Sequence, residues 1–589
     1  MKNEVKQCQN CKKDFIIEPE DFSFYEKIKV PPPTFCPECR TIRRLCWRNE
    51  MSLYKRKCDA EGHNENIITI YHPEEKLVVY DIKSWWGDKW DSISYGQEYD
   101  FTKPFFQQWK ELRDRIPLQC LSNSNAKNSD YCNVAEDSKD SYMSSGSWKI
   151  EKTFYSNRIS ETKESSDLYV VHRSELCYDD IFCTDCYHTL YSLRCKNCVD
   201  SYFLYDCHGC INCFGCTNLR SKSYCMWNEQ LSREEYNNRL SKLNLKSYKT
   251  ILELKERFNK LYFKSIHHFA NQVRVINSTG DNLEGTKNCK FGFDASGRIE
   301  DSKYIHWVAK MAKDTYDSGP GIGEAEMLYE VFDTGLGNFR NLFTSVVYSS
   351  NEVEYSFNCY GCSYLFGCLG LRSKTHCILN KQYSKEEYEA LVPKIKEHMN
   401  KMPYIDSKER VYKYGEFFPA EISPFAYNET AAQDYFPLTK EEALKRGYRW
   451  RDRKTNEYIT TMQAENVPDS LEDISDSIIE EIISCLHKGK CKDRCLGAFK
   501  ITKDELNLYR QLGVPSPRLC FICRHEERLR KRNPMKLWHR TCMCGSTGSP
   551  QATNNHGHTG KCNNEFESAY APDRPEIVYC ENCYNKEVY

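Results

Sequence analysis

Residues 36–58 read CPECRTIRRLCWRNEMSLYKRKC, and residues 520–542 read CFICRHEERLRKRNPMKLWHRTC. Both stretches belong to longer segments that start at Phe15 and Phe499 and align without a gap at an offset of 484 residues. Each stretch contains a CxxC pair, the tight turn that supplies two thiolates to one zinc ion. The sequence therefore predicts the same zinc-binding module near both ends of the chain.

The first module has a full set of ligands for one zinc ion. Cys8 and Cys11 form one CxxC pair, and Cys36 and Cys39 form the second. Structural zinc prefers four thiolate or imidazole ligands in tetrahedral geometry, whereas catalytic zinc keeps one position open for water. We therefore predict a closed structural site here. Metal binding would supply much of the folding free energy of so small a module.

The second module and the C-terminal residues offer ligands for two more zinc ions. For the second site we expect a CxxxC pair together with the later CxxC pair: Cys491, Cys495, Cys520 and Cys523. For the third site five thiols compete, namely Cys542, Cys544, Cys562, Cys580 and Cys583. We favour the last four of these over Cys542, and His556 and His558 are substitutes. The total is about three Zn²⁺ ions.

The N-terminal copy lacks two of the C-terminal thiols. Residues 71–80 match residues 570–579, but Asp81 and Ser84 then stand where the other copy has Cys580 and Cys583. Cys542 has a counterpart, Cys58, in the N-terminal copy, which lacks the other two thiols. Because a cysteine persists there without the rest of the site, Cys542 is not among the favoured ligands. The sequence thus predicts that this metal site is lost from the N-terminal copy. We interpret His63 as an ordinary loop histidine.

Arginines recur after each CxxC pair. Their spacing of four residues places three of them on one face of a helix, and a fourth follows further along. Because the guanidinium fork suits phosphates, we interpret this arginine stripe as a nucleic-acid contact surface. The alternatives are ion pairs with acids inside the fold and an ordinary solvated basic face. The stripe comprises Arg40, Arg44, Arg48 and Arg56 in the first module and Arg524, Arg528, Arg532 and Arg540 in the second.

A second duplication fills the middle of the chain. The segment from Cys207 matches the segment from Cys359 at an offset of 152 residues, and many of its cysteines are nine residues apart. Short strands and tight turns repeated in this way indicate a β-solenoid. Some of these cysteines become Leu or Val in the other copy, which favours packing over metal binding. A further metal site is the alternative, with ligands among Cys207, Cys210, Cys216, Cys225, Cys359, Cys362, Cys368 and Cys377.

The predicted fold is multidomain and mainly β with some α. Duplicated zinc-ribbon, treble-clef-like modules flank a duplicated Cys-rich, solenoid-like middle with capping helices. Ser232 with Glu235 and Ser384 with Glu387 form capping boxes at two of these helices. The expected segments are a zinc ribbon (1–60), an aromatic-rich extension (61–119), the first solenoid-like repeat (120–231), a helical connector (232–272), the second repeat (273–383), a helix (384–402), a linker with an acidic amphipathic helix (403–484), the second zinc ribbon (485–541) and the C-terminal zinc site (542–589).

The totals limit the function classes. With 589 residues the chain is too long for one core, and a net charge of −1 means that any nucleic-acid surface must be a local patch. No apolar run approaches the length of a membrane span, and the charged start lacks the apolar core of a signal peptide. Clustered cysteines, 33 in total, are then typical of metal ligands in a reducing compartment. We expect a soluble cytoplasmic protein rather than a secreted disulfide scaffold.

Three long motifs carry a family resemblance. They are CPECRTIRRLCWRNEMSLYKRKC, FFPAEISPFAYNETAAQDYFPLTKEEALKRGYRWRD (417–452) and APDRPEIVYCENCYNKEV near the end. With these motifs the chain resembles a family of large Cys-rich zinc-ribbon proteins found in candidate-phyla-radiation bacteria and some giant viruses. The resemblance covers most of the chain and implies zinc binding. The chain departs from the family pattern at Asp81, where a cysteine is expected.

Three functions are compatible with these features. The leading hypothesis is a non-enzymatic zinc scaffold whose end modules contact RNA or DNA. The second is a scaffold for protein assembly without nucleic acid, which exposed aromatic side chains on the solenoid-like repeats would favour. The third is an enzyme, but no P-loop, Rossmann fingerprint, GxSxG or HNH-like histidine set is present. The sequence does not indicate the oligomeric state.

Overall fold

The computed structural model describes residues 2–452, 459–491, 494–545 and 562–589. The chain forms two compact units, each assembled from segments far apart in the sequence. Unit 1 contains residues 1–121, 270–452 and 535–537, and unit 2 contains residues 122–269, 453–534 and 538–589. Each unit therefore combines one terminal zinc module with one of the two middle repeats, and the N-terminal module belongs with the second repeat.

Unit 1 begins with the first zinc module and ends with short helices. Its strands outside the repeat are β1 (Glu4–Gln7), β2 (Asp14–Ile17), β3 (Tyr54–Lys57), β4 (Asn66–Thr69), β5 (Val79–Tyr80), β6 (Leu118–Gln119), β32 (Tyr404–Ile405) and β33 (Val411–Tyr412). Its helices are α1 (Pro19–Ile28), α2 (Pro37–Leu45), α3 (Ile82–Trp86), α4 (Phe105–Arg115), α7 (Lys385–Lys401), α8 (Ala431–Tyr435) and α9 (Lys440–Lys445).

The repeat of unit 1 is a single sheet of fourteen strands, which we call the second coil stack. Its strands are β18 (Gln272–Val273), β19 (Gly280–Lys287), β20 (Gly292–Glu300), β21 (His306–Lys313), β22 (Tyr316–Ser318), β23 (Ile322–Glu326), β24 (Tyr329–Thr334), β25 (Asn338–Leu342), β26 (Ser345–Tyr348), β27 (Asn351–Glu354), β28 (Phe357–Tyr360), β29 (Ser363–Phe366), β30 (Thr375–Ile378) and β31 (Lys381–Gln382). All neighbouring strands pair in parallel except β30 and β31.

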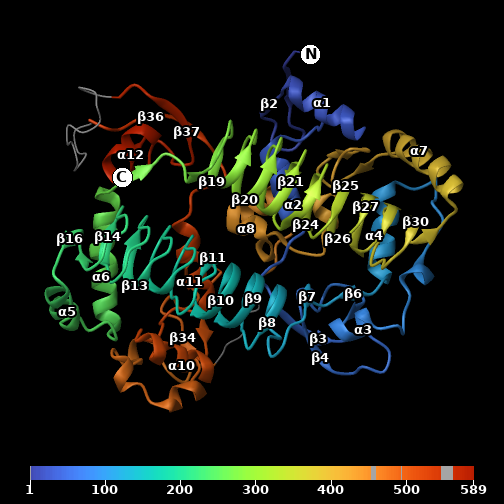
Figure 1. The fold of residues 1–589 in the computed structure, drawn as a ribbon. Coiled ribbons are helices and arrows are strands. Elements are labelled where there is room, and N and C mark those ends of the chain that lie inside the picture. Colours follow the sequence, from blue (N-terminus) through green and yellow to red (C-terminus); the bar gives the residue numbers. More distant parts are fainter. Residues whose placement is uncertain (1, 453–458, 492–493, 546–561) are drawn as a thin grey trace. The chain divides into compact units, whose positions relative to one another are not determined.

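Unit 2 holds the first coil stack, residues 123–230, and the other zinc module (Figure 1). The strands of the stack are β7 (Asn123–Ser124), β8 (Asn133–Lys139), β9 (Ser145–Phe154), β10 (Asn157–Ser166), β11 (Tyr169–His172), β12 (Tyr187–Leu190), β13 (Val199–Tyr205), β14 (Phe214–Thr217), β15 (Cys225–Met226) and β16 (Glu229–Gln230). The remaining elements are α5 (Arg233–Ser241), α6 (Tyr248–Lys264), β17 (Ile266–His268), β34 (Ile483–Ser484), β35 (Ala498–Phe499), α10 (Lys503–Leu512), α11 (Phe521–Arg530), β36 (Trp538–Thr541), β37 (Glu565–Ser568), β38 (Ile577–Tyr579) and α12 (Glu581–Val588).

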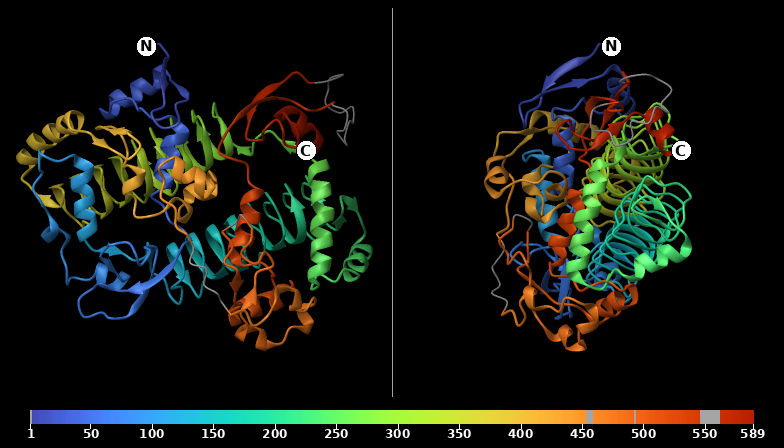
Figure 2. Two further views of the ribbon diagram at one scale, coloured as in Figure 1. Left: turned by 180° about the vertical axis from the view of Figure 1, so that it is seen from behind. Right: turned by 90° about the vertical axis from the view of Figure 1, so that its left-hand side faces the viewer.

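The first coil stack repeats every 12 residues. Asn123 pairs with Ala135, which pairs with Ser147, and the same parallel register continues through Ile159 to Val171. The backbone also adopts a positive φ at nearly every third residue, for example 55° at Asp179 and 56° at Asp185. These left-handed residues form the corners of each coil, and Asn and Asp adopt that conformation more readily than most side chains. Figure 2 shows the stacked coils from the side.

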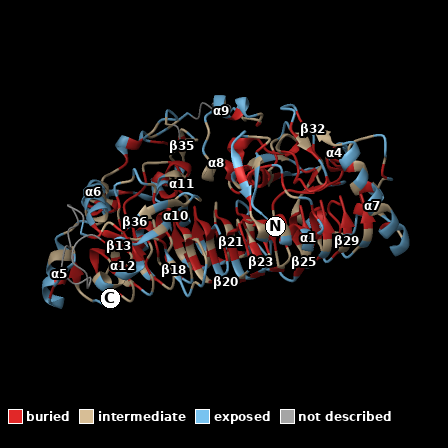
Figure 3. Ribbon diagram, turned by 90° about the horizontal axis from the view of Figure 1, so that it is seen from above, coloured by how far each residue is buried: buried red, intermediate tan, exposed pale blue. Residues whose placement is uncertain are grey.

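Inward side chains of the coils form a narrow interior. Every third residue from Cys177 to Cys216 is buried, and the set comprises cysteine, serine, threonine, leucine and one aspartate. Figure 3 shows buried and exposed positions alternating along the strands of the second coil stack. From Cys177 to Cys216, no side chain larger than leucine occupies the inward positions. The nine-residue spacing of cysteines is therefore a multiple of the three-residue step between inward positions.

The helices differ from expectation in one place. The helical connector contains two helices, α5 and α6, and α6 packs against β13 and β14 of the first coil stack. The predicted amphipathic α-helix after Asp469 is wrong. That segment forms short 3-10 turns at Leu471–Asp473 and Asp476–Glu480 before β34. Its closely spaced Ser and Asp side chains compete for backbone hydrogen bonds, and its β-branched Ile residues disfavour a helix.

The two predicted capping boxes have different outcomes. Ser384 and Glu387 form the reciprocal box at the start of α7, whereas at α5 the Ser232 side chain accepts the Glu235 N–H in a one-way cap. In the aromatic-rich extension, Trp85 and Trp109 are fully buried in the core of unit 1, whereas Trp86 is 41% exposed. Much of the region after residue 403 is packed rather than extended, since Tyr412 and Phe417 are buried in the same core. No helix among the described residues has the length and apolar character to cross a membrane.

Candidate metal centres

Four cysteines of the first module converge as predicted. The donor atoms of Cys8, Cys11, Cys36 and Cys39 all lie within 4.8 Å of one another. The Sγ atoms of Cys11 and Cys36 are 3.7 Å apart. Four thiolates at about 2.3 Å from a tetrahedral zinc ion are separated by roughly 3.8 Å, so the cluster has the size that Zn²⁺ requires. All but Cys11 are buried, which fits a closed structural site.

A hairpin and a helix start build this site. Cys8 directly follows β1, and Cys11 lies three residues before β2 in the same hairpin. Cys36 is the N-cap of α2, and its backbone N–H donates to Cys8 Sγ over 3.2 Å. The Asn10 amide donates to Cys39 Sγ over 3.2 Å. Such N–H donors stabilise the thiolate form of a cysteine, which is the form that binds metal.

The first cysteine of the cluster is the most acidic. Hydrogen bonds from the thiols of Cys36 and Cys39 hold the pKa of Cys8 far below its usual value. Cys485 occupies the same place in the second cluster, and the Cys520 and Cys523 thiols lower its pKa to about 4. These hydrogen bonds favour the thiolate form of Cys8 and Cys485, which is the form that binds metal.

The second cluster corrects the predicted ligand set. It consists of Cys485, Cys495, Cys520 and Cys523, whose donor atoms lie within 4.8 Å of one another. Cys485 directly follows β34, as Cys8 follows β1, and its Sγ accepts the Cys520 N–H over 3.3 Å. Cys491 was predicted in this place, but it belongs to a smaller group with His487 that shares Cys523. The hairpin between β34 and β35 is longer than the hairpin between β1 and β2, so the first ligand of the second cluster lies further toward the N-terminus in the sequence.

The third cluster corrects one further ligand. Cys542, Cys562, Cys580 and Cys583 lie within 4.8 Å of one another. Cys542 follows β36 directly, and its Sγ accepts the N–H of Cys580, the N-cap of α12, over 3.2 Å. Cys544, which was favoured over Cys542, lies in the loop beyond the strand, with its Sγ 3.4 Å from that of Cys583. His556 and His558 lie outside the described residues.

Single substitutions separate ligands from neighbours at these two clusters. We expect Cys485→Ser and Cys542→Ser each to remove one zinc ion per chain, because each residue completes a tetrahedral set. Cys491→Ser and Cys544→Ser are the matched controls and should leave the zinc content unchanged. Elemental analysis of the purified full chain measures this directly. Loss of zinc from a control variant with retention in its partner would reverse the assignment.

The arginine stripe of the first module is buried inside unit 1. Arg40 Nη2 lies 2.8 Å from Asp317 Oδ2, and Arg44 Nη1 lies 3.2 Å from Glu330 Oε2. Arg48 Nη1 lies 3.1 Å from an Asp333 carboxylate oxygen, again on the second coil stack. Side chains of all three arginines are at most 2% exposed. They bind acids of the stack, so they are not available to phosphates.

The second module repeats this arrangement inside unit 2. Arg524 Nε and Arg528 Nη1 lie 3.0 Å and 2.7 Å from Asp167 Oδ1 on the first coil stack. Asp167 and Arg528 side chains are each 1% exposed. Two guanidinium groups converge on one buried carboxylate, so loss of that carboxylate would leave both without this partner. The prediction that these arginines form an exposed phosphate-contact surface is therefore wrong in both modules.

The outer members of the stripe are half-buried and also bonded within the fold. Arg56 donates to the Leu77 carbonyl over 2.9 Å, and Arg540 donates to the Tyr570 carbonyl over 3.3 Å. Arg532 donates to the Tyr169 hydroxyl over 3.1 Å. The alternative interpretation, ion pairs and hydrogen bonds within the fold, accounts for the spacing of the stripe. Its recurrence in both modules reflects the same docking contact.

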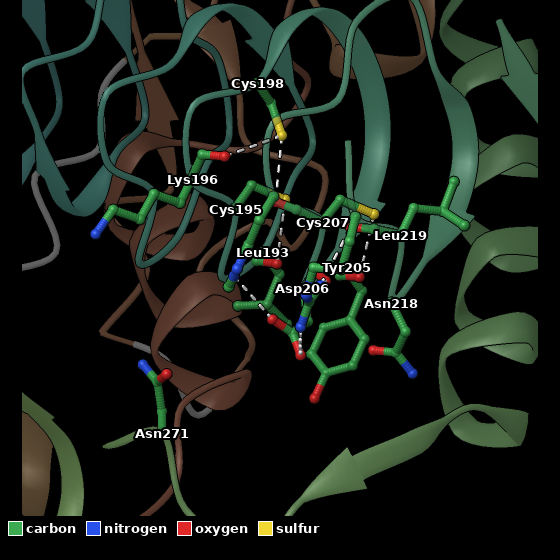
Figure 4. Close-up of polar contacts among 12 residues, drawn as sticks. Leu193, Cys195, Lys196, Cys198, Tyr205, Asp206, Cys207, Asn218, Leu219 and Asn271 are labelled. Carbon is green, nitrogen blue, oxygen red and sulfur yellow. Dashed lines mark hydrogen bonds and ion pairs between the residues drawn. The ribbon is translucent and has the colours of Figure 1, made fainter. Parts of the chain in front are cut away.

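Cysteines of the coil stacks point inward and bond to the backbone. Cys198 Sγ lies 3.2 Å from the Cys207 carbonyl oxygen, and Cys207 Sγ lies 3.5 Å from that of Tyr205 (Figure 4). Serines at equivalent inward positions make the same contact, as Ser165 does with the Lys163 carbonyl. Cys, Ser and Thr are thus interchangeable in this interior. This favours the packing interpretation of these thiols.

The eight proposed extra ligands do not gather as the terminal cysteines do. Among the residues that the structure describes, no three of them bring their Sγ atoms within 4.8 Å of one another. All eight are buried, in the interior of one stack or the other: Cys207, Cys210, Cys216, Cys225, Cys359, Cys362, Cys368 and Cys377.

Comparison with known proteins adds no family to this description. No protein-family model matches the chain, and no curated protein matches it.

Proposed function

We propose that this chain is a non-enzymatic, zinc-stabilised scaffold for protein assembly. In this proposal the two coil stacks are β-solenoids, and each is held by a terminal zinc-ribbon module. About three Zn²⁺ ions hold the modules in the shape that presents their arginines. We also place the protein in a reducing compartment such as the cytoplasm, since all 33 of its cysteines are free thiols.

The observation that carries the proposal is the burial of the arginine stripes. A helix that starts at a metal ligand directs its arginines into acids at the corners of a coil stack, and this occurs once in each unit. The metal clusters thereby have a structural role, because each one fixes the start of a helix that docks on a coil stack. Four-thiolate sites also lack the open position that a catalytic zinc keeps.

An exposed apolar stripe on the first coil stack offers a binding surface. Tyr187 pairs with Val199, and Val199 pairs with Ile211, so the three side chains lie on successive coils. Tyr187 is 45% exposed and Ile211 is 44% exposed. Apolar and aromatic side chains in an ordered row are the usual anchors of protein interfaces. Exposed aromatics are also the feature that separates an assembly scaffold from a nucleic-acid-binding one.

Reconstitution with a purified partner tests the scaffold. A partner recovered by crosslinking should bind the Tyr187→Lys, Ile211→Lys double variant at least ten-fold more weakly than the unchanged chain. Tyr131→Lys is the control, because Tyr131 is also exposed on the first coil stack but lies away from the stripe. Equal binding by all three chains would remove the stripe from the proposal.

Nucleic-acid binding is the outcome that would contradict this function. Phosphate contacts strengthen steeply as salt falls, so the purified chain should bind neither labelled RNA nor DNA even at about 50 mM salt. Tight, salt-sensitive binding at neutral pH would show that another basic surface serves the nucleic-acid function. Gel-shift titrations across several salt concentrations make the measurement.

A further inference from the structure

The N-terminal copy repeats the framework of the third zinc cluster. Cys58 directly follows β3 as Cys542 follows β36, and both strands belong to antiparallel hairpins. His63 lies three residues before β4, and Cys562 lies three residues before β37. Asp81 is the N-cap of α3, as Cys580 is of α12. The ligand positions of the C-terminal site are therefore occupied in the N-terminal copy by Cys, His and Asp.

We propose that Cys58, His63 and Asp81 bind a fourth metal ion, a divalent transition metal such as Zn²⁺, with one coordination position left open. The metal site predicted to be lost from this copy is, in this proposal, retained with a different ligand set. His63 is then a ligand and not an ordinary loop histidine. All three residues belong to unit 1.

Distances within the trio fit a metal ion. Asp81 Oδ2 lies 3.4 Å from Cys58 Sγ and 3.2 Å from His63 Nδ1. Donors at about 2.3 Å for sulfur and about 2.0 Å for nitrogen and oxygen around a tetrahedral zinc are roughly 3.3 to 3.5 Å apart. The three donor atoms all lie within 4.8 Å of one another, as in the three four-cysteine clusters.

One backbone hydrogen bond is common to all four places. The N–H of Asp81 donates to Cys58 Sγ over 3.3 Å. The equivalent N–H groups of Cys36, Cys520 and Cys580 donate to the first sulfur of their clusters over 3.2 to 3.3 Å. The chain therefore directs the Cys58 sulfur toward the start of a helix in the same way as at the metal clusters.

The Asp81 carboxylate divides its two oxygens between two tasks. Oδ1 accepts the Ser84 N–H over 3.0 Å and caps α3, so Oδ2 remains for a metal ion. His63 Nδ1 is shielded from solvent and makes no hydrogen bond to the residues that the structure describes. Its other ring nitrogen, Nε2, lies 3.7 Å from a Glu65 oxygen, where a carboxylate can orient a metal-bound imidazole. The alternative is a simple His–Asp ion pair, with the buried Cys58 thiol hydrogen-bonded to Asp81.

The residue at the fourth ligand position leaves one coordination position of the proposed metal ion open. Ser84 stands where the C-terminal copy has Cys583, so the last thiolate is missing. Three protein ligands of mixed type with a fourth position for water are typical of zinc sites that bind an exchangeable ligand. The two copies would thus hold a closed structural ion at one end and an accessible ion at the other.

Metal counting tests the site on the full chain. We expect four Zn²⁺ ions per chain, falling to three in His63→Ala and in Asp81→Asn. Cys120→Ser is the matched control, since Cys120 is a buried free thiol in the same unit and not a ligand in this proposal. Three ions in the unchanged chain with no loss in either variant would overturn the proposal and leave the three four-cysteine sites intact. Fewer than three would instead count against the zinc scaffold itself.

A gain-of-ligand variant tests the open position independently of folding losses. Ser84→Cys should restore a fourth thiolate and convert the site to a closed one. With Co²⁺ in place of Zn²⁺, azide should shift the visible absorption of the unchanged chain and leave that of Ser84→Cys unchanged. If azide did not change the absorption of the unchanged chain, the proposal of an open coordination position would be wrong. If azide changed the absorption of both chains equally, residue 84 would not lie beside the open coordination position.

Discussion

Replacing Cys520 and Cys523 together by serine is expected to unfold the second zinc module and release it from the first coil stack. The two thiolates are half of the ligand set, and zinc contributes roughly 10 kcal/mol or more to the folding of modules of this size. Cys520 also caps α11, the helix that carries Arg524 and Arg528. Loss of the metal should therefore abolish both the module and its contact with Asp167.

The control for this variant has the same spacing in a different environment. Cys183 and Cys186 also form a CxxC pair, but both are buried inside the first coil stack, where Cys183 bonds to the Ile181 carbonyl. Serine occupies equivalent inward positions, so Cys183→Ser with Cys186→Ser should keep the full zinc content. Elemental analysis and hydrogen exchange over residues 520–532 measure the two effects. Equal zinc loss in both double variants would contradict the assignment of metal and packing cysteines.

The sequence was most informative where the determinants are local. A CxxC pair at a helix start brings two ligands together within one turn, so Cys36 with Cys39 and Cys520 with Cys523 could be assigned without a structure. Cys485 could not, because its place depends on the length of the hairpin between β34 and β35. The signal was present in the sequence: extending the same offset of 484 residues before Phe15 puts Lys492 opposite Cys8, so a ligand had to come from elsewhere.

The contacts of the arginine stripe are long-range and could not be predicted from the sequence. The spacing of the stripe correctly indicated one helix face with a shared role, but not the partner of that face. The acids that it meets, Asp317 and Glu330 in one unit and Asp167 in the other, are more than 270 residues away in the chain. They occupy left-handed corners of the coils, with φ of 49°, 50° and 60°. Corner positions recur every three residues along the coil. The nine-residue spacing of the cysteines is a multiple of this step, so the sequence indicated the step only in part.

Asp167→Asn is expected to destabilise unit 2 by about 3–5 kcal/mol. One carboxylate pairs with both Arg524 and Arg528, and removing it leaves two buried guanidinium groups without that partner. Asn is nearly isosteric and tolerates the left-handed corner, so the change removes charge with little change in shape. Thermal or denaturant unfolding of the full chain measures the loss, and hydrogen exchange in α11 locates it.

Asp185→Asn is the matched control, and the comparison decides between docking and phosphate binding. Asp185 is also a left-handed corner of the first coil stack, with φ of 56°, and it also pairs with an arginine, Arg173. Arg173 is 52% exposed and Asp185 is half-buried at 33%, so solvent screens the pair and its loss should cost less than about 1 kcal/mol. Equal stability of the two variants would mean that the guanidinium groups of the second module do not depend on Asp167, and their availability to phosphates would then have to be reconsidered.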